Sequence, residues 1–309
     1  MNEFRPDRWI LAWSVQTRSR MTGAASFPLT THQVDETTLT VPTRSGPMST
    51  LVYLSRGIAP LSGDEHSRPP LHIQFHGGGM IGRAVREDEH VSRYLASETG
   101  AIVLTPHFRA APQVTFPTTE QDCFDVLQWA RANADRYGWD PERITVGGTG
   151  TGAKLALNVA QQAHETRMGL AGLIATTPVT DVSRPNRNPI AEQQGDDEQD
   201  GFLHRLYAKI VTFTADAYFP DPESRIQPLA SPAYDLALVK KMPPVFIQTG
   251  SDDLLKDDGE NLAKRLNKAR KPFLLTEYEA GHGLTIHGSN EVIQQALDDQ
   301  VAFLLNLYQ

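Results

Sequence analysis

The stretch Ile144–Asn158 constrains this chain more than any other, because it predicts a strand, a sharp turn and a helix in immediate succession. Its first residues, Ile144 to Gly147, are typical of a buried strand, and the apolar spacing after the turn is helical. Between them lies Gly148-Thr-Gly-Thr-Gly152. This is the context of the G-x-S-x-G turn, called the nucleophile elbow, which presents a nucleophilic serine. Both outer glycines of this elbow stand where the pattern needs them. The middle position holds Gly150 instead of serine.

Composition excludes several classes of protein. A chain of 309 residues can bury roughly three quarters of its unfolded surface, so one large core is feasible. With 29 Lys and Arg against 37 Asp and Glu, the net charge of −8 argues against a nucleic-acid partner. Cys123 is the sole cysteine, which precludes an internal disulfide, and its apolar neighbours predict a buried thiol. No apolar run approaches the ~20 residues of a membrane span, and no signal peptide is recognised, so we expect a cytoplasmic protein without a membrane partner. A homodimer is left open.

Strands and helices alternate along most of the chain. An antiparallel hairpin is expected at 37–41 and 49–54, around a turn at Arg44–Pro47. Further strands are expected at 71–75, 101–105, 144–147, 172–177, 245–249 and 273–278, and helices at 87–99, 119–137, from the elbow to about 167, 258–269 and 291–307. This alternation predicts an α/β fold with a mostly parallel sheet covered by helices on both faces.

Two segments fall outside that alternation and predict a helical cap. Residues 1–35 carry scattered aromatic residues, with an amphipathic helix expected at Trp9–Thr22. About 65 residues separate the strands near Thr177 and Pro244, which is too long for a compact connection. They include a polar, acidic run at 181–201 and an amphipathic helix at Leu203–Phe219. Since ligands of open α/β sheets bind at the carboxyl ends of the strands, we expect one domain, 1–309, capped by 1–35 and 181–228.

Six short motifs, in consistent order and spacing, give the chain a resemblance to a known family. They are His76-Gly-Gly-Gly79, Phe108-Arg-Ala-Ala-Pro112 with Phe116-Pro117, Asp140-Pro-Glu-Arg-Ile144, Pro228-Leu-Ala-Ser-Pro232, Asp253–Gly259 and Gly281-His-Gly-Leu284. With them the chain resembles the hormone-sensitive-lipase-like, carboxylesterase-like family of the α/β-hydrolase superfamily, over nearly everything after residue 37. The resemblance implies the α/β-hydrolase fold with a helical cap.

The resemblance also implies an oxyanion hole and a catalytic pair. The glycine turn after His76 matches the family's oxyanion motif, so Gly78 and Gly79 are the expected amide donors, with the amide of Thr151 as the third. His282 matches the catalytic histidine and Asp253 the acid that orients it. His287 stays open as an alternative to His282, and Asp252 or Asp257 as alternatives to Asp253.

The nucleophile is the part that this sequence lacks. In the family the elbow carries a serine, and glycine has no side chain that could form an acyl intermediate. Thr149 is expected to point under the turn and the side chain of Thr151 onto its other side, so neither is well placed to replace the serine. A laboratory substitution would more often be alanine, and the flanking threonines depart from the family too, so we interpret Gly150 as natural divergence.

Three functions are compatible with this pattern. The first is a serine-less enzyme in which His282 and Asp253 perform non-covalent acid/base chemistry on a small, mostly apolar carbonyl compound, plausibly of specialised metabolism: elimination, cyclisation, carbon–carbon bond formation or cleavage, or isomerisation. The second is an ester or lactone hydrolase in which His282 activates water directly. The third is a ligand-binding protein or receptor, which would have no need of the intact pair.

The expected pocket and the absence of cofactors complete the prediction. Its lining is expected to include side chains from the glycine turn and from the capping helix, namely Met80, Ile81, Phe108, Leu206, Ile210 and Phe213. No metal is implied, because His72 and His76 belong to a strand and its turn. The glycine-rich turn lacks the P-loop Gly-Lys-Ser/Thr ending, so we expect no nucleotide and no other cofactor.

Overall fold

The structure, a computed structural model, describes residues 30–63, 67–82, 86, 88–183 and 212–308. The segments 1–29 and 184–211, the second of which includes most of the acidic run 181–201, therefore lie outside the described residues. This applies to the helix predicted at Trp9–Thr22 and to most of the helix predicted at Leu203–Phe219.

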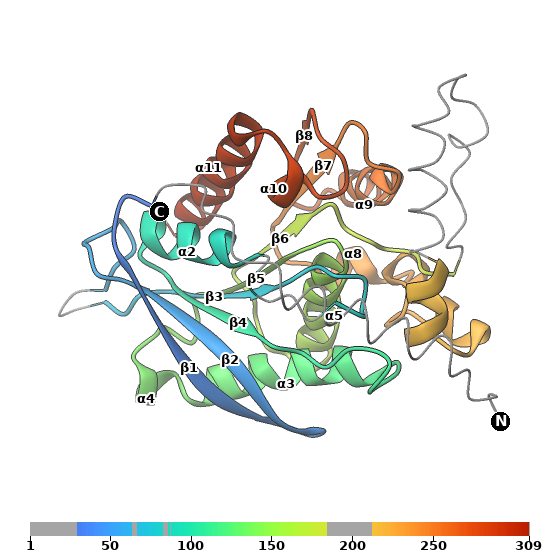
Figure 1. The fold of residues 1–309 in the computed structure, drawn as a ribbon, viewed down its shortest axis with the longest axis horizontal. Coiled ribbons are helices and arrows are strands. Elements are labelled where there is room, and N and C mark those ends of the chain that lie inside the picture. The colour runs from blue at the N-terminus through green and yellow to red at the C-terminus, as the bar shows by residue number, and fades with distance from the viewer. Residues whose placement is uncertain (1–29, 64–66, 83–85, 87, 184–211, 309) are drawn as a thin grey trace.

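Eight strands form one sheet in the order β1-β2-β4-β3-β5-β6-β7-β8 (Figure 1). The two N-terminal strands form an antiparallel hairpin, β2 runs antiparallel to β4, and every other neighbouring pair is parallel. The strands are β1 (Val34–Thr43), β2 (Gly46–Ser55), β3 (Leu71–Phe75), β4 (Ile102–Pro106), β5 (Ile144–Thr149), β6 (Gly172–Thr176), β7 (Val245–Gly250) and β8 (Phe273–Tyr278). The predicted hairpin and the predicted parallel sheet are both confirmed.

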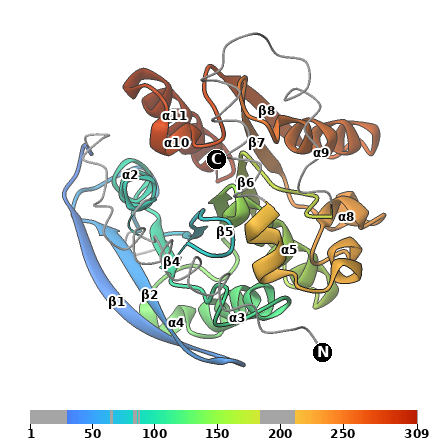
Figure 2. The same cartoon turned by 45° about the vertical axis from the view of Figure 1, so that its right-hand side comes forward.

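Helices cover both faces of this sheet, as Figure 2 shows. The longer ones are α2 (Glu89–Thr99), α3 (Thr118–Ala132), α5 (Thr151–Glu165), α9 (Lys256–Lys268) and α11 (Asn290–Asn306), and the short ones are α4 (Ala134–Tyr137), α8 (Leu238–Lys241) and α10 (Leu284–His287). Apolar side chains of α2 and α11 pack in one cluster with the sheet, and those of α3, α5 and α9 pack in another on the opposite face. The predicted α/β class, with two helical layers around a parallel sheet, is confirmed.

The long helix predicted at 119–137 is wrong in one respect, because it is broken at Asn133. The side chain of Asn133 donates from Nδ2 to the carbonyl of Trp129 at 2.8 Å, and its backbone leaves the helical region with φ −110° and ψ 11°. Asparagine competes in this way for main-chain partners, so α3 ends there and the single turn of α4 follows. Gly138, with φ 85°, closes α4.

Strand β5 is also longer than predicted. We expected it to end at Gly147, yet it continues through Gly148 and Thr149. A β-carbon on Gly147 would lie 2.9 Å from Cε1 of His72, and one on Gly148 only 2.3 Å from the backbone of Gly152. The glycines are therefore used within the strand as well as in the turn, because they allow β3 and α5 to approach the backbone of β5.

The carboxyl ends of the parallel strands bring distant segments together. The His76 turn follows β3, Gly150 follows β5, Asp253 lies three residues beyond the end of β7, and His282 follows β8 after a short loop. In parallel sheets these ends share one edge, which is where such folds bind ligands. The order of strands therefore places four of the predicted site segments around one point.

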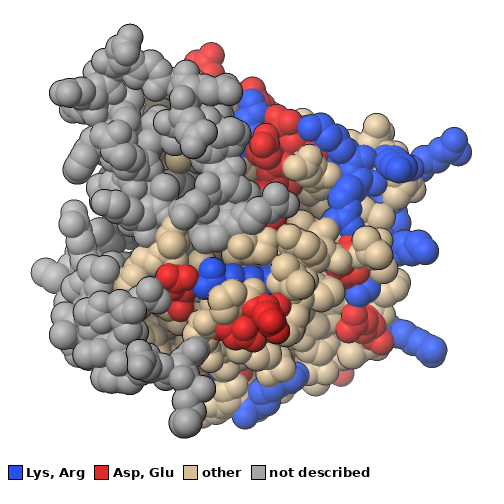
Figure 3. Space-filling view, turned by 90° about the vertical axis from the view of Figure 1, so that its right-hand side faces the viewer, with Lys and Arg blue, Asp and Glu red and all other residues tan. Residues whose placement is uncertain are grey.

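Among the described residues on the face that Figure 3 presents, both positive and negative side chains are exposed. Lysine and arginine lie among aspartate, glutamate and uncharged residues there. Within the described part of the chain, no helix is both long and apolar enough to cross a bilayer.

Candidate functional site

The imidazole of His282 is held by the carboxylate of Asp253. Its Nδ1 lies 3.0 Å from Oδ1 and 3.1 Å from Oδ2 of Asp253. The aspartate side chain is 1% exposed, whereas that of His282 is 25% exposed. A carboxylate on Nδ1 stabilises the tautomer in which Nδ1 carries the proton and Nε2 is the basic nitrogen. The predicted pair is therefore assembled geometrically, with its basic nitrogen turned away from the acid.

Local backbone contacts position both partners. The amide of Leu255 donates to Oδ1 of Asp253 at 2.8 Å, which fixes the carboxylate at the entry to α9. The hydroxyl of Thr177, just after β6, donates to the carbonyl of His282 at 3.0 Å. Thr177 adopts a positive φ of 44°, which is uncommon for a residue other than glycine. Sequence patterns did not reveal Thr177, because its role depends on a contact across 105 positions.

The alternatives to this pair lie elsewhere. Asp252 and Asp257 are exposed, and only Asp253 bonds to the imidazole. His287 ends the short helix α10, and its ring packs over the backbone of Gly283. The geometry therefore favours His282 and Asp253 over the alternatives that the sequence left open.

Gly150 lies at the sharp turn between β5 and α5. Its φ of 58° and ψ of −116° belong to a region that side chains disfavour, and its amide donates to the carbonyl of Thr176 at 2.9 Å. A β-carbon on Gly150 would lie 3.0 Å from Nε2 of His282. The position directly faces Nε2 of the imidazole, as expected for the middle residue of the elbow.

The glycine turn after His76 is strongly bent. Gly78 and Gly79 have φ values of 109° and 64°, and a β-carbon on Gly78 would lie 3.0 Å from the Cα of Gly82. Glycine is thus favoured at Gly78 and Gly79 by the positive φ, and at Gly78 also by the close approach of the backbone of Gly82. The buried carboxylate of Asp88, at the entry to α2, accepts from the amide of Gly77 at 2.9 Å and anchors the turn. Sequence reasoning missed Asp88, which looks like an ordinary residue before a helix.

One contact in this turn differs from the expected oxyanion hole. The amide of Gly79 donates to Oγ1 of Thr151 at 3.1 Å. We predicted Thr151 as an amide donor whose side chain lies on the opposite side of the elbow from Thr149, and we predicted no contact of that side chain with the glycine turn. Instead its hydroxyl reaches the glycine turn, because Thr151 begins α5 next to β3.

Three of the six residues predicted to line a pocket are buried, namely Met80, Ile81 and Phe108. Ile81 and Phe108 belong to the main apolar cluster with Met80, and the ring of Phe108 stacks on His76 at 4.0 Å between centroids. Phe213 is partly buried and packs against the same cluster. Leu206 and Ile210 lie outside the described residues. A lining role for these six stays a prediction.

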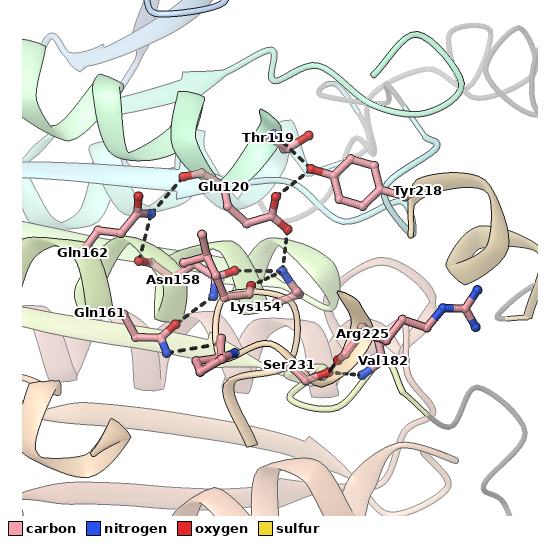
Figure 4. A network of polar contacts seen from close by, with 12 residues as sticks. Thr119, Glu120, Lys154, Asn158, Gln161, Gln162, Val182, Tyr218, Arg225 and Ser231 are labelled. Carbon is pink, nitrogen blue, oxygen red and sulfur yellow. Dashed lines mark hydrogen bonds and ion pairs between the residues drawn. The ribbon is translucent and has the colours of Figure 1, made fainter. Parts of the chain in front are cut away.

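A buried polar network that the sequence did not predict connects α3 with α5 (Figure 4). Lys154, four residues after Gly150, is fully buried and donates to Glu120 at 2.7 Å, to Asn158 at 2.8 Å and to the carbonyl of Leu229 at 3.1 Å. Tyr218 donates to the other oxygen of Glu120 at 2.6 Å. Burial lowers the pKa of Lys154. The network joins α3, α5 and the segment after residue 212.

Cys123 is buried in the main apolar cluster, as predicted. Burial raises the pKa of its thiol well above the usual range, which is typical of a structural cysteine. His72 is also fully buried, with Nδ1 2.9 Å from the hydroxyl of Thr145 and Nε2 3.0 Å from Oε1 of Gln74. Among the residues that the structure describes, no three acidic, histidine or cysteine side chains gather in a way that could hold a metal ion.

Comparisons with known proteins agree with this geometry. The chain matches the model of the α/β-hydrolase fold family over residues 72–286, more than half of its length. It is 28% identical over 206 residues to an arylesterase of Saccharolobus solfataricus, and 30% identical over 207 residues to the carboxylesterase NlhH of Mycobacterium tuberculosis. These matches cover 66% and 65% of this chain.

Similarity extends to solved structures. An esterase of Pyrobaculum calidifontis superposes with a TM-score of 0.79 and 26% identity, over 99% of this chain and 96% of that one. By contrast, the sequence matches span only 64% of the arylesterase and 61% of the carboxylesterase. The family match, the strand order and the fold-wide superposition lead to one conclusion: the chain belongs to the α/β-hydrolase fold family and has esterases among its relatives.

Proposed function

We propose that this protein hydrolyses a small, mostly apolar ester by means of water that His282 activates directly, without an acyl-enzyme. In this proposal Asp253 orients the histidine, and Gly78, Gly79 and Thr151 supply the oxyanion amides. Gly150 occupies the position at which the family's serine would stand. The relatives are esterases, which favours hydrolysis over the other reactions that the sequence allowed.

One observation carries the proposal. Nε2 of His282 faces the site of a missing side chain, 3.0 Å from where a β-carbon of residue 150 would lie, while Nδ1 is held by a buried carboxylate. A general base must lie within hydrogen-bond reach of the proton it removes. A water molecule, or a substrate hydroxyl, beside Gly150 would meet that condition.

The reaction then needs no covalent intermediate. His282 takes a proton from water as the water oxygen bonds to the ester carbonyl carbon, and the resulting oxyanion is stabilised by the amides. The tetrahedral intermediate collapses, the bond to the leaving oxygen breaks, and the protonated imidazole returns the proton to it. General-base help is worth about 10²–10⁴-fold, and each oxyanion donor about 10²–10³-fold, which suits an activated ester.

We also propose that the chain forms a single domain with a cap made by 1–35 and 181–228. The described part of that insertion supports this. A β-carbon on Gly79 would lie 2.9 Å from Cγ2 of Thr214, so the helical residues 212–218 lie directly against the glycine turn. Such a position above the strand ends restricts which substrates reach the site.

Elimination, cyclisation and the related non-hydrolytic reactions, which ranked first from the sequence, gain no support from the esterase relatives and stay predictions. A purely binding role stays a prediction too, although it gives no reason for the pairing of His282 with Asp253. Location in the cytoplasm and a homodimer likewise remain predictions.

The test is the hydrolysis of 4-nitrophenyl acetate by the purified full chain. We expect slow, linear release of 4-nitrophenol with no initial burst, and no covalent labelling by a fluorophosphonate. His282→Asn should lower kcat about 10²–10⁴-fold, because it removes the base and leaves the fold intact.

His287→Asn serves as the matched control and should retain turnover. If His282→Asn hydrolyses the ester as fast as the unaltered protein, the mechanism is wrong. If the unaltered protein releases no 4-nitrophenol above the buffer rate, hydrolysis is excluded, and the non-hydrolytic and binding functions move ahead of it.

A further inference from the structure

The hydroxyl of Thr151 is bonded to one of the amides that we assign to the oxyanion hole. Its Oγ1 accepts from the amide of Gly79 at 3.1 Å. Productive oxyanion donors lie 2.7–3.1 Å from the oxygen they stabilise. The hydroxyl oxygen of Thr151 therefore stands, relative to Gly79, at the distance expected for the oxygen of a ligand.

The surroundings confine Gly79 to this contact. It has a φ of 64°, and the methyl group of Thr214 lies on its other side, 2.9 Å from the place of a β-carbon. Gly77, two residues earlier, is anchored by its bond to Asp88. Gly79 thus contacts both Thr151 at the start of α5, through its amide, and Thr214 of residues 212–218, through its α-carbon side.

We propose that Thr151 is an internal competitor for the oxyanion hole, whose hydroxyl a substrate carbonyl must displace from the Gly79 amide. This inference deepens the proposed function, on which it rests for the identity of the ligand as a carbonyl compound. Displacement is feasible by rotation about χ1, since threonine in a helix divides between two rotamers. Thr151 would accordingly set how strongly this site binds any carbonyl oxygen.

The size of the effect follows from what the carbonyl must break. A typical intramolecular hydrogen bond corresponds to a factor of roughly 2–13 in an equilibrium constant. If the hydroxyl is displaced, Thr151→Ala should improve carbonyl binding about 3- to 10-fold. If the hydroxyl is never displaced, the Gly79 amide cannot stabilise the transition state of the unaltered chain. Thr151→Ala would then restore this donor and raise kcat by up to about 10²-fold.

The experiment compares Thr151→Ala with Thr151→Ser in the full chain. Acetophenone, a ketone that cannot be hydrolysed, is titrated into ¹⁵N-labelled protein while the Gly79 amide signal is followed. We expect Thr151→Ala to shift that amide signal in the absence of ligand and to bind acetophenone about 3- to 10-fold more tightly. Thr151→Ser also lacks the methyl group but keeps the hydroxyl. Its affinity for acetophenone should therefore stay close to that of the unaltered protein.

A kinetic arm repeats the comparison with 4-nitrophenyl acetate in the Gly150→Ser background, where a serine supplies the nucleophile. There Thr151→Ala should raise kcat/KM at least 3-fold. An unchanged Gly79 signal, or acetophenone affinity that stays equal or weakens in Thr151→Ala, overturns the inference. Failure of the native chain to hydrolyse esters would refute the proposed function alone, because ketone affinity does not depend on turnover.

Discussion

A β-carbon on Gly150 would lie 3.0 Å from Nε2 of His282, closer than side-chain carbons normally approach such an atom. The imidazole thus occupies part of the space that a side chain at residue 150 would use. A side chain at residue 150 would therefore require the imidazole to move by a few tenths of an ångström.

Gly150→Ser should create a reactive but imperfect nucleophile. The new hydroxyl would lie within reach of Nε2, provided that the imidazole moves by a few tenths of an ångström. We expect slow covalent labelling by a fluorophosphonate, followed by mass spectrometry of the intact protein, where the unaltered chain gives none. A serine variant that folds and resists labelling would show that His282 does not face residue 150.

Gly150→Ala should destabilise the fold without creating activity. A side chain at a φ of 58° and ψ of −116° is strained by about 1–3 kcal/mol. Denaturant unfolding should report that loss in the free energy of unfolding. Gly169→Ala, at an open surface position with nothing within 4 Å, is the control and should change stability far less.

Asp253→Asn should reduce ester turnover about as strongly as loss of the base itself. The amide of asparagine cannot hold the proton on Nδ1 as the carboxylate does, so we expect kcat to fall about 10²–10⁴-fold with KM nearly unchanged. Asp252→Asn is the matched control, because Asp252 is an exposed neighbour. Equal activity of the two variants would remove Asp253 from the mechanism.

Lys154→Met should destabilise the protein by about 3–5 kcal/mol. The substitution leaves the carboxylate of Glu120 buried without its cation, and removing one partner of a buried pair costs about this much. Thermal or urea unfolding measures the change. The double variant Lys154→Met with Glu120→Gln removes both charges and should recover most of the loss. If it is no more stable than Lys154→Met alone, the pair is not what stabilises this region.

His72 should make the fold sensitive to acid. Burial lowers its pKa from 6.5 to about 4. Between these two pH values the histidine of the unfolded chain binds a proton that the native one does not. The contribution of His72 to the free energy of unfolding is therefore complete above pH 6.5 and is lost as the pH is lowered toward 4. The group's share of this loss is about 3 kcal/mol at most.

The measurement is urea unfolding of the unaltered protein and of His72→Gln at pH 7 and pH 4.5. His72→Gln cannot titrate, so its stability should depend less on pH over this range. Parallel pH profiles of the two proteins would contradict the assignment to His72.

Local patterns were sufficient for most of the elements. Alternation and apolar runs predicted all eight strands, and β8 has the predicted bounds. Errors in the predicted bounds arose at two kinds of place. At Asn133 a side chain competes for a backbone hydrogen-bond partner four residues away, and in β5 glycines continue the strand. Both depend on neighbours that no single-residue propensity describes.

By itself, the sequence determined the α/β alternation, the glycine turns and the absence of a serine at Gly150, because these depend on residue type and short spacing. Only the tertiary structure decided which aspartate meets His282, which hydroxyl meets the Gly79 amide, and how Lys154 is paired with Glu120. These contacts join residues 29, 72 and 34 positions apart. Spacing along the chain carries no information about distance across a folded sheet, whereas packing sets such contacts to within tenths of an ångström.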